Sequence, residues 1–471
     1  MSIGKPLWIW EELAAAAGGT ADGTPEHIVT GFSIDSRTIA PDEVFVALKD
    51  QRDGHDFVTD AFLRGAAAAL VAETYLRRSG DGALIRTADP LTALAAIGRA
   101  ARARTRTTIF AVTGSVGKTG TKEALRGCLA RLGTTHAAEK SFNNQWGVPL
   151  TLARMPSDAA FGVFEIGMNH AGEIAPLTRL VRPHVAIVTT VEPVHLAYFD
   201  SVEAIAEAKA EIFLGLEPGG SAILNRDNAH CRLLAARAAA GGARIVTFGR
   251  QAGADVHADV WRPQADGTDL EAVVFDRRVA YRVGAAGEHL ALNSLAVVAA
   301  LAAAGLDAAR AVGAFADVRV PAGRGARTEL AVAGGAVLLI DESYNANPAS
   351  MRAALAALAM VPRTRFPRRV GVLGDMLELG PTAPDLHRGL REAIDAAGVD
   401  LVFACGSNMR LLFDDLPASQ RGFWAAESSG LLTPLLATLR IGDAVMVKGS
   451  LGSRMEPLAA AIKILTNPPI E

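Results

Sequence analysis

The stretch TTIFAVTGSVGKTGTKEALRGCLARL, from Thr107 to Leu132, decides the fold class of this chain. Its first part, Thr107 to Val112, is apolar and β-branched, which is typical of a buried strand. A glycine-rich turn follows from Thr113 to Thr119, and apolar residues then recur at helical spacing from Leu125 to Leu132. A strand, a glycine turn and a helix in this order predict a phosphate-binding loop in an α/β fold.

The residue types in this loop suit a nucleoside triphosphate. Glycines let backbone N–H groups approach the phosphates, and the N-terminus of the following helix adds positive potential. Lys118 would reach the β- and γ-phosphates, and the hydroxyl of Thr119 would bind Mg²⁺. The chain departs from the general pattern at one position, where Val112 stands in place of a glycine. The predicted binding loop comprises Thr113, Gly114, Ser115, Val116, Gly117, Lys118 and Thr119.

Composition limits the possible classes of protein. A length of 471 residues suggests about three domains. The 47 basic and 50 acidic residues give a net charge of −3, so we expect neither nucleic acid nor an anionic membrane as a partner. Cys128, Cys231 and Cys405 are scattered, as in a protein of the reducing cytoplasm.

The chain shows no pattern of an export signal or a membrane span. Glu11 and Glu12 stand where a signal peptide would have its apolar run. The longest apolar stretch, Leu295 to Leu306, is too short to cross a bilayer and predicts a buried helix. We therefore expect a cytoplasmic protein without membrane insertion.

Patterns along the chain divide it into three domains. In the first we expect helices at Trp8 to Ala17 and Ala61 to Ala69, with strands near Ser33 and Val44. The middle domain begins with a helix at 91–102. Its further strands are predicted at 162–166, 185–191, 222–224 and 244–248, and 321–327 reads as a linker. The domains span residues 1–88, 89–328 and 329–471.

The third domain has the clearest repeat. Four apolar runs, at 336–340, 370–373, 401–404 and 444–447, alternate with helical patterns, which predicts a parallel, doubly wound sheet. A polar cluster directly follows each run. Because ligands of such sheets bind outside the carboxyl ends of the strands, this domain is expected to bind a small polar molecule.

Two polar residues follow strands of the middle domain. Glu165 ends the apolar strand at 162–166, where a carboxylate beside a nucleotide loop is a natural Mg²⁺ ligand. His195 follows the next strand, and its position suits either a metal or phosphate ligand or an ordinary loop histidine.

Lys209 lies on the inward face of a predicted helix at 201–216. Ile205, Ile212 and Phe213 stand at i−4, i+3 and i+4 from it, which places Lys209 on the apolar stripe. Its amine could reach water at the end of a packed stem, or be buried with a depressed pKa and react with CO₂ to give a carbamate. The pattern alone favours the first alternative.

Taken together, these motifs resemble the Mur ligase superfamily over essentially the whole chain. The superfamily loop needs no glycine at the position of Val112. The blocks SYNANPASM, GDMLELG and VKGSLGSRME resemble those of the member that adds a D-alanyl dipeptide. The resemblance rests on DSR at Asp35, DGHDF at Asp53, TGSVGKT at Thr113, NNQWGVPLTL at Asn143, FEIGMNHAGEI at Phe164, HLAYFDSVEAIAEAKAEIF at His195, DESYNANPASM at Asp341, VLGDMLELG at Val372 and VKGSLGSRME at Val447.

The resemblance implies a fold and a reaction. It implies a small α/β N-terminal domain for a UDP-sugar, a central P-loop domain with a mainly parallel sheet, and a C-terminal Rossmann-like domain that binds the incoming dipeptide. In the implied reaction, Mg²⁺-ATP phosphorylates the terminal carboxylate of UDP-N-acetylmuramoyl tripeptide. The amine of D-alanyl-D-alanine then attacks the acyl phosphate, giving ADP, phosphate and a UDP-linked pentapeptide for peptidoglycan synthesis. We expect a monomer.

The resemblance also assigns roles to residues. Thr119 would hold one Mg²⁺ ion, and Glu165, His195 and an N6-carboxylated Lys209 would hold a second. The resemblance therefore favours the carbamate over an unmodified Lys209 whose amine reaches water. Further roles are implied for His289 and Asn293 at the adenine, Arg324 at the γ-phosphate, Asp341 or Glu342 at the ribose, Ser36 and Arg37 at the UDP-sugar, and Asn143, Asn144, Asn345, Asn347, Lys448, Ser450 and Arg454 at the peptide substrates or between domains.

Other functions fit the sequence less well. A ligase adding diaminopimelate would resemble a DNPR pattern that the chain lacks, and a folylpolyglutamate-type ligase would lack the first ninety or so residues. A nucleotide-gated binding protein would need neither an inward Lys209 nor a full third domain. The third residue of the tripeptide, lysine or diaminopimelate, stays open.

Overall fold

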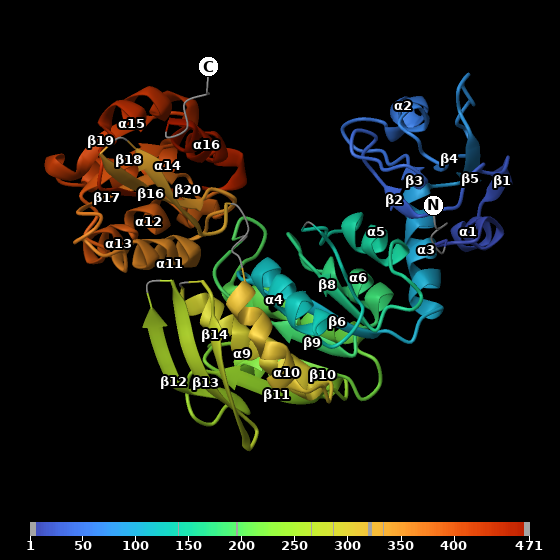
Figure 1. The fold of residues 1–471 in the computed structure, drawn as a ribbon, viewed down its shortest axis with the longest axis horizontal. Coiled ribbons are helices and arrows are strands. Elements are labelled where there is room, and N and C mark those ends of the chain that lie inside the picture. Colours follow the sequence, from blue (N-terminus) through green and yellow to red (C-terminus); the bar gives the residue numbers. More distant parts are fainter. Residues whose placement is uncertain are drawn as a thin grey trace.

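The computed structural model describes residues 6–139, 141–194, 196–264, 266–285, 287–318, 323–332 and 334–465. They form three sheets in chain order, each with its own helices. In Figure 1 the first unit (blue) and the third (orange to red) stand apart on either side of the middle one. The expected α/β class is confirmed. No helix in the described ranges is both long and apolar enough to span a membrane.

The first sheet has the order β1-β5-β4-β3-β2 and is parallel except for β1. The prediction of a helix at Ala61 to Ala69 is wrong beyond Leu63, because the helix ends there and Gly65 turns the chain at φ 98°. Ala68 to Val71 are then fully buried in a strand, so alanine here fills a sheet core. The elements are α1 (Trp10–Ala17), β1 (Thr20–Asp22), β2 (Gly31–Ser33), β3 (Glu43–Val46), α2 (Val58–Leu63), β4 (Ala68–Ala72) and β5 (Ala83–Thr87).

The middle sheet has the order β14-β13-β12-β11-β10-β9-β6-β8-β7. Strands β6 to β12 pair in parallel, and β13 and β14 extend the sheet as antiparallel strands. The strands are β6 (Thr108–Thr113), β7 (Thr135–Ala137), β8 (Phe161–Glu165), β9 (Val185–Val188), β10 (Ser221–Asn225), β11 (Arg244–Gly249), β12 (Val256–Gln264), β13 (Gly267–Val274) and β14 (Arg277–Val283).

Helices cover both faces of this sheet. Phe110 and Val112 of β6 point into one core with α4 and α9, which run side by side in Figure 1, and Ile109 and Ala111 point into the other with α5 to α8. Successive side chains of β6 point to opposite faces of the sheet, and helices bury both faces. The helices are α3 (Pro90–Ala103), α4 (Lys118–Ala130), α5 (Gly147–Ala153), α6 (Ile174–Val181), α7 (Val202–Ala210), α8 (Cys231–Ala240), α9 (Glu288–Ala303) and α10 (Ala308–Ala311).

The third sheet has the order β15-β16-β20-β17-β18-β19 and is parallel except for β15. It begins at Ala326, so residues 326–328 lie in this sheet and not in the middle one. The elements are β15 (Ala326–Val332), β16 (Gly335–Glu342), α11 (Pro348–Ala359), β17 (Arg368–Gly374), α12 (Ala383–Arg388), α13 (Arg391–Ala396), β18 (Leu401–Cys405), α14 (Ser407–Asp415), β19 (Arg421–Ala425), α15 (Leu432–Thr438), β20 (Asp443–Lys448) and α16 (Glu456–Leu465).

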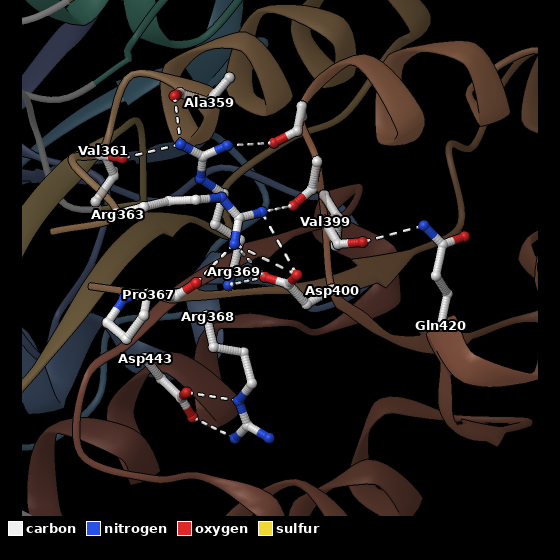
Figure 2. Close-up of polar contacts among 12 residues, drawn as sticks. Ala359, Val361, Arg363, Pro367, Arg368, Arg369, Val399, Asp400, Gln420 and Asp443 are labelled. Atoms are coloured by element: carbon white, nitrogen blue, oxygen red, sulfur yellow. Dashed lines mark hydrogen bonds and ion pairs between the residues drawn. The ribbon is translucent and has the colours of Figure 1, made fainter. Parts of the chain in front are cut away.

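The amino ends of these parallel strands are fixed by arginines (Figure 2). At the start of β17, Arg368 binds both carboxylate oxygens of buried Asp443 at 2.7 and 2.6 Å. Arg369 donates to the carbonyls of Ala359, Val361 and Ala397, each within 2.9 Å. This edge is therefore structural, and the carboxyl ends are left for ligands.

Candidate active site

The glycine loop lies where the parallel strands of the middle sheet end. It joins β6, which pairs with β8 on one side and β9 on the other, to the N-terminus of α4. Gly114 and Gly117 have φ values of 147° and 87°. A Cβ on Gly114 would lie 1.9 Å from Thr189 Oγ1, so only glycine fits there. The loop has the backbone of a phosphate cradle.

Glu165 lies directly beside the first turn of α4. Its Oε2 accepts a hydrogen bond from the Thr119 hydroxyl at 2.9 Å, and its Oε1 accepts one from Asn143 Nδ2 at 2.8 Å. The carboxylate is 2% exposed. Within the described residues, no group of three or more histidine, cysteine, aspartate or glutamate side chains could hold a metal ion. Hard oxygen atoms of one carboxylate and one hydroxyl nevertheless suit Mg²⁺, which takes its other ligands from phosphate and water.

Two positive charges lie next to this carboxylate. Lys118 donates to the Gly114 carbonyl at 2.7 Å. Desolvation, aided by Arg324, lowers the pKa of Lys118, and Glu165 opposes the change. Arg324 stacks on the Tyr344 ring at 4.0 Å and lies 3.4 Å from the Ser141 hydroxyl. Arg324 thus spans from the third domain to the nucleotide loop.

Lys209 lies inside the protein, as its helical position predicts. It is 2% exposed near the end of α7. Burial, together with the charge of Lys118, places the pKa of Lys209 well below its ordinary value. An amine in this state is available in its neutral form. His195, the other predicted ligand, lies outside the described residues.

The predicted adenine residues stand on the first turns of α9. A Cβ on Gly117 would lie 2.5 Å from Asn293 Nδ2, so Asn293 lies against the loop. His289 is exposed, and its imidazole interacts electrostatically with Glu342 and Lys448. The start of α9 therefore faces the third domain.

The carboxyl ends of β16 and β20 carry a buried ionic cluster. Asp341 accepts from the Ser343 hydroxyl at 2.6 Å and pairs with Lys463 at 2.9 Å. Burial alone would raise the pKa of Asp341, but these two partners bring it below its ordinary value. Lys448 pairs with Glu342 at 3.2 Å and donates to the Asn345 carbonyl at 2.9 Å. Glu342, in contact with Lys448 and near His289, is the acidic residue nearer the middle domain.

Three of the predicted substrate residues make hydrogen bonds within the protein. Asn144 Oδ1 accepts from the backbone N–H groups of Trp146 and Gly147 at the start of α5. Asn347 caps α11 in a capping box. Ser450 bridges the Leu377 N–H and the Ala346 carbonyl, while Arg454 is exposed.

Two cavities lie near the residues described above, and one of them reaches the loop at Thr119. One, which we call the N-terminal cavity, has a volume of about 1050 Å³ and lies between the first sheet and α5. The predicted UDP-sugar residues Ser36 and Arg37 line it, and Arg37 pairs with Asp35 at 2.8 Å. The other, the α4 cavity, has a volume of about 760 Å³. Its lining includes Thr119, Glu123, Arg126, Glu139, Ser141 and Arg324. Glu139 lines both cavities.

Comparisons with known proteins agree with this arrangement. Residues 112–301 match the Mur ligase middle domain, and residues 326–451 match the Mur ligase glutamate ligase domain. The UDP-N-acetylmuramoyl-tripeptide–D-alanyl-D-alanine ligase of Rickettsia prowazekii is 30% identical over 455 residues, covering 96% of this chain and 99% of that protein. The chain belongs to the Mur ligase family.

Solved structures extend the likeness of this Mur ligase to three dimensions. MurF from Acinetobacter baumannii has a TM-score of 0.84 at 28% identity, covering 98% of this chain and all of that one. MurF from Thermotoga maritima, solved in complex with ADP, has a TM-score of 0.74 at 25% identity, covering 92% of this chain and 97% of that one. The family likeness inferred from the motifs is confirmed.

The structure of this Mur ligase adds residues that the sequence did not reveal. Ser141 contacts both Thr119 and Arg324, and Tyr344 supports the Arg324 guanidinium. Glu139 and Arg126 line the α4 cavity. Tyr344 lies within a quoted block and Ser141 lies two residues before one, but a serine or an exposed tyrosine carries no spacing signal, so only the contacts identify them.

Proposed function

We propose that this Mur ligase uses ATP to join D-alanyl-D-alanine to a UDP-N-acetylmuramoyl tripeptide in peptidoglycan precursor synthesis. The observation that carries the proposal is the extent of the similarity. The R. prowazekii ligase of that name aligns with 96% of this chain and therefore with all three sheets. A protein that shared only the ATP-binding loop would match around β6 and α4 alone.

The nucleotide is assigned to the loop at 113–119. Glycines leave room for phosphate oxygens, and Lys118 and Arg324 offset their charge. The contact of Asn293 with Gly117 supports placing the base beside α9, with His289 near it. The ribose is assigned to Glu342 rather than Asp341, since the Asp341 carboxylate is already held by Ser343 and Lys463.

Magnesium is assigned to the oxygen ligands beside the loop. Thr119 would hold one ion, and Glu165, His195 and an N6-carboxylated Lys209 would hold a second. Magnesium bound there would offset the charge that develops during phosphoryl transfer. The buried position and lowered pKa of Lys209 support the carbamate, because CO₂ reacts with the neutral amine.

The reaction would take place where the two cavities meet. A carboxylate oxygen of the tripeptide bonds to the γ-phosphorus as the bond to the β-phosphate oxygen breaks. The dipeptide amine then bonds to the acyl carbon, the bond to the phosphate oxygen breaks, and the nitrogen gives up a proton. Lys118 and Arg324 stabilise the first step by charge, and closure of the third domain brings the amine to the acyl carbon.

The remaining substrate assignments follow the cavities. Ser36 and Arg37 would bind the UDP-sugar in the N-terminal cavity, and Lys448 with Asn345 would border the dipeptide. We also assign the protein as a monomer. We assign the reaction to the cytoplasm, where ATP is available.

A coupled assay tests the function. Purified protein with Mg²⁺, ATP and UDP-N-acetylmuramoyl tripeptide should release phosphate steadily only when D-alanyl-D-alanine is added, and mass spectrometry should detect the pentapeptide. N-acetylated dipeptide, which lacks the nucleophilic amine, is the matched control and should be inactive. Equal phosphate release without dipeptide would refute the ligase assignment.

A further inference from the structure

The middle and third domains also contact each other away from Arg324. The Ala197 backbone N–H, in the loop after β9, donates to the Glu378 carbonyl, in the loop after β17, at 3.1 Å. Gly380 lies against the same segment, because a Cβ built on it would be 3.1 Å from the Leu196 carbonyl oxygen and 3.4 Å from Ala197 Cα. We call Leu196, Ala197, Glu378 and Gly380 the latch. It joins the carboxyl ends of parallel strands in two sheets, the edges at which ligands bind.

The loop on the third-domain side of the latch is firmly anchored. Met376 is 1% exposed, and its backbone N–H donates to His387 Nε2 at 2.9 Å. Leu379 lies in the same buried core, and its carbonyl accepts from the Thr382 hydroxyl at 2.9 Å. This loop therefore moves together with the third domain.

The backbone between these anchors takes an unusual conformation. Glu378 and Gly380 have φ values of 61° and 60°, in the left-handed region that glycine adopts readily and glutamate rarely. Such a conformation persists only where the surrounding structure holds it, and it is found preferentially at functional sites. Here the residue with the strained backbone is the one whose carbonyl accepts from Ala197.

The loop on the middle-domain side is anchored as well. Phe199 is buried in the core of the middle domain, and Leu196 packs against the edge of that core. The Tyr198 ring stacks on His170, from the loop after β8, with 4.4 Å between the ring centroids. Because both sides of the latch are anchored, neither loop can absorb a change in the distance between the two domains.

The latch is also connected to the residues proposed to border the dipeptide. Ser450 Oγ accepts from the Leu377 N–H at 2.9 Å and donates to the Ala346 carbonyl at 3.2 Å. Asn345 directly precedes Ala346, and Lys448 lies two positions before Ser450. The contact made by the latch therefore sets how far these residues lie from the nucleotide loop of the middle domain.

We propose that the latch holds the third domain at the distance that amide formation requires. It acts on the attack of the dipeptide amine and not on phosphoryl transfer, since Lys118, Thr119 and Glu165 all belong to the middle domain. Its members are positioning residues, which act through the placement of Asn345 and Lys448. This inference rests on the proposed ligase function.

The test inserts a methyl group into the latch. In Gly380→Ala the added Cβ would lie 3.1 Å from the Leu196 carbonyl, so the two domains must separate by a few tenths of an ångström. A misplacement of about 1 Å can cost roughly 100-fold in rate, so we expect kcat/KM for D-alanyl-D-alanine to fall about tenfold. Single-turnover ADP formation from ATP and the UDP-linked tripeptide, without dipeptide, should stay within about twofold of wild type.

Gly398→Ala is the matched control. Gly398 also lies in the third domain and has a φ of 58°, so both substitutions strain the backbone alike. A Cβ there would meet only the ends of the Arg363 and Arg369 side chains, at 3.1 and 3.5 Å. Gly398→Ala should therefore leave both steps within about twofold of wild type.

A second variant loosens the latch loop without adding any atom. Thr382→Ala removes the hydrogen bond to the Leu379 carbonyl. It should lower kcat/KM for the dipeptide about threefold, the effect of one neutral hydrogen bond, and should leave single-turnover ADP formation unchanged.

Small-angle X-ray scattering gives a readout that is independent of catalysis. Without substrates, Gly380→Ala should have a larger radius of gyration than the wild type, because the third domain is no longer held against the loop after β9. Gly398→Ala should have the radius of gyration of the wild type.

The possible outcomes separate the inference from the function. Equal kcat/KM for the dipeptide in Gly380→Ala and Gly398→Ala would overturn the inference and leave the ligase function intact. An equal fall in single-turnover ADP formation in Gly380→Ala would also overturn it, since the latch would then act on the nucleotide site. If the wild type shows no dipeptide-dependent phosphate release, the proposed function fails and the inference fails with it.

Discussion

A substitution of Asn143 tests the proposal that Glu165 binds magnesium. The sequence groups Asn143 with the substrate residues, but in the structure its amide donates to Glu165 Oε1 at 2.8 Å. We therefore expect Asn143→Ala to weaken magnesium activation. The other oxygen of Glu165 keeps its bond from Thr119, so the carboxylate loses one of its two hydrogen bonds.

The size of the effect follows from that single contact. A hydrogen bond to a charged group contributes roughly 1.5–3 kcal/mol, and about 1.4 kcal/mol corresponds to a factor of ten. Because Asn143 is half-buried and water can replace part of the bond, we take the lower end of the range. The Mg²⁺ concentration for half-maximal activity should rise about tenfold, within the range for residues that orient metal ligands.

The assay is phosphate release titrated with Mg²⁺ at saturating substrates. Excess Mg²⁺ should restore most of kcat, and the KM for the UDP-linked tripeptide should change little. Asn144→Ala is the matched control, since it removes the neighbouring amide. That change should cost about 1 kcal/mol of stability, because Asn144 no longer accepts from the Trp146 and Gly147 N–H groups at the start of α5, but should leave the Mg²⁺ response unchanged. An unchanged Mg²⁺ response in Asn143→Ala with a raised tripeptide KM would refute the reasoning.

Four other substitutions have definite expected outcomes. Lys209→Ala should abolish phosphate release, with partial recovery on adding a short carboxylic acid that replaces the carbamate; near-normal activity would exclude the carbamate. Asp443→Asn should lower the free energy of unfolding by about 2–4 kcal/mol in denaturant titrations, because it breaks a two-bond pair at a buried carboxylate, without changing KM for any substrate. Gly127→Ala should raise the free energy of unfolding by about 0.5–1 kcal/mol, since the added Cβ meets only Ala314 at 3.7 Å. Gly117→Ala should lower the free energy of unfolding, because Gly117 has a φ of 87° and an added Cβ would lie 2.5 Å from Asn293 Nδ2.

The sequence pattern alone predicted the elements whose apolar residues are all buried on the expected face. The strand before the glycine loop, the inward face of Lys209 and the four βα units of the third domain follow from periodicity, and the structure contains them all. Runs of alanine were ambiguous, as at Ala61 to Ala69, because alanine packs equally well in helices and in buried strands. The antiparallel strands β12 to β14 were not predicted, since alternating residues on a half-exposed surface lack a continuous apolar run.

The contacts of the site could not be predicted, because they join residues that are distant in sequence. Thr119 meets Glu165 across 46 positions, and Arg324 meets Ser141 across 183. The family resemblance could assign these residues to a site, but it could not decide which of two adjacent residues has a given role. The ion pair of Asp341 with Lys463 distinguishes Asp341 from Glu342 only in the structure. The same is true of the bond that Asn144 accepts from the Gly147 N–H and of the helix cap made by Asn347.

The position of Arg324, outside both sheets, bears on its proposed role at the phosphates. It lies two positions before β15, with its guanidinium between Ser141 of the middle domain and Tyr344 of the third. When a domain turns about the segment that joins it to its neighbour, residues next to that segment move least. A cation placed there stays near the γ-phosphate, while Glu342 and Lys448, farther into the third domain, move over larger distances. Under the proposed function, Arg324 would therefore serve phosphoryl transfer in more open arrangements, whereas capture of the dipeptide amine would require the third domain to close.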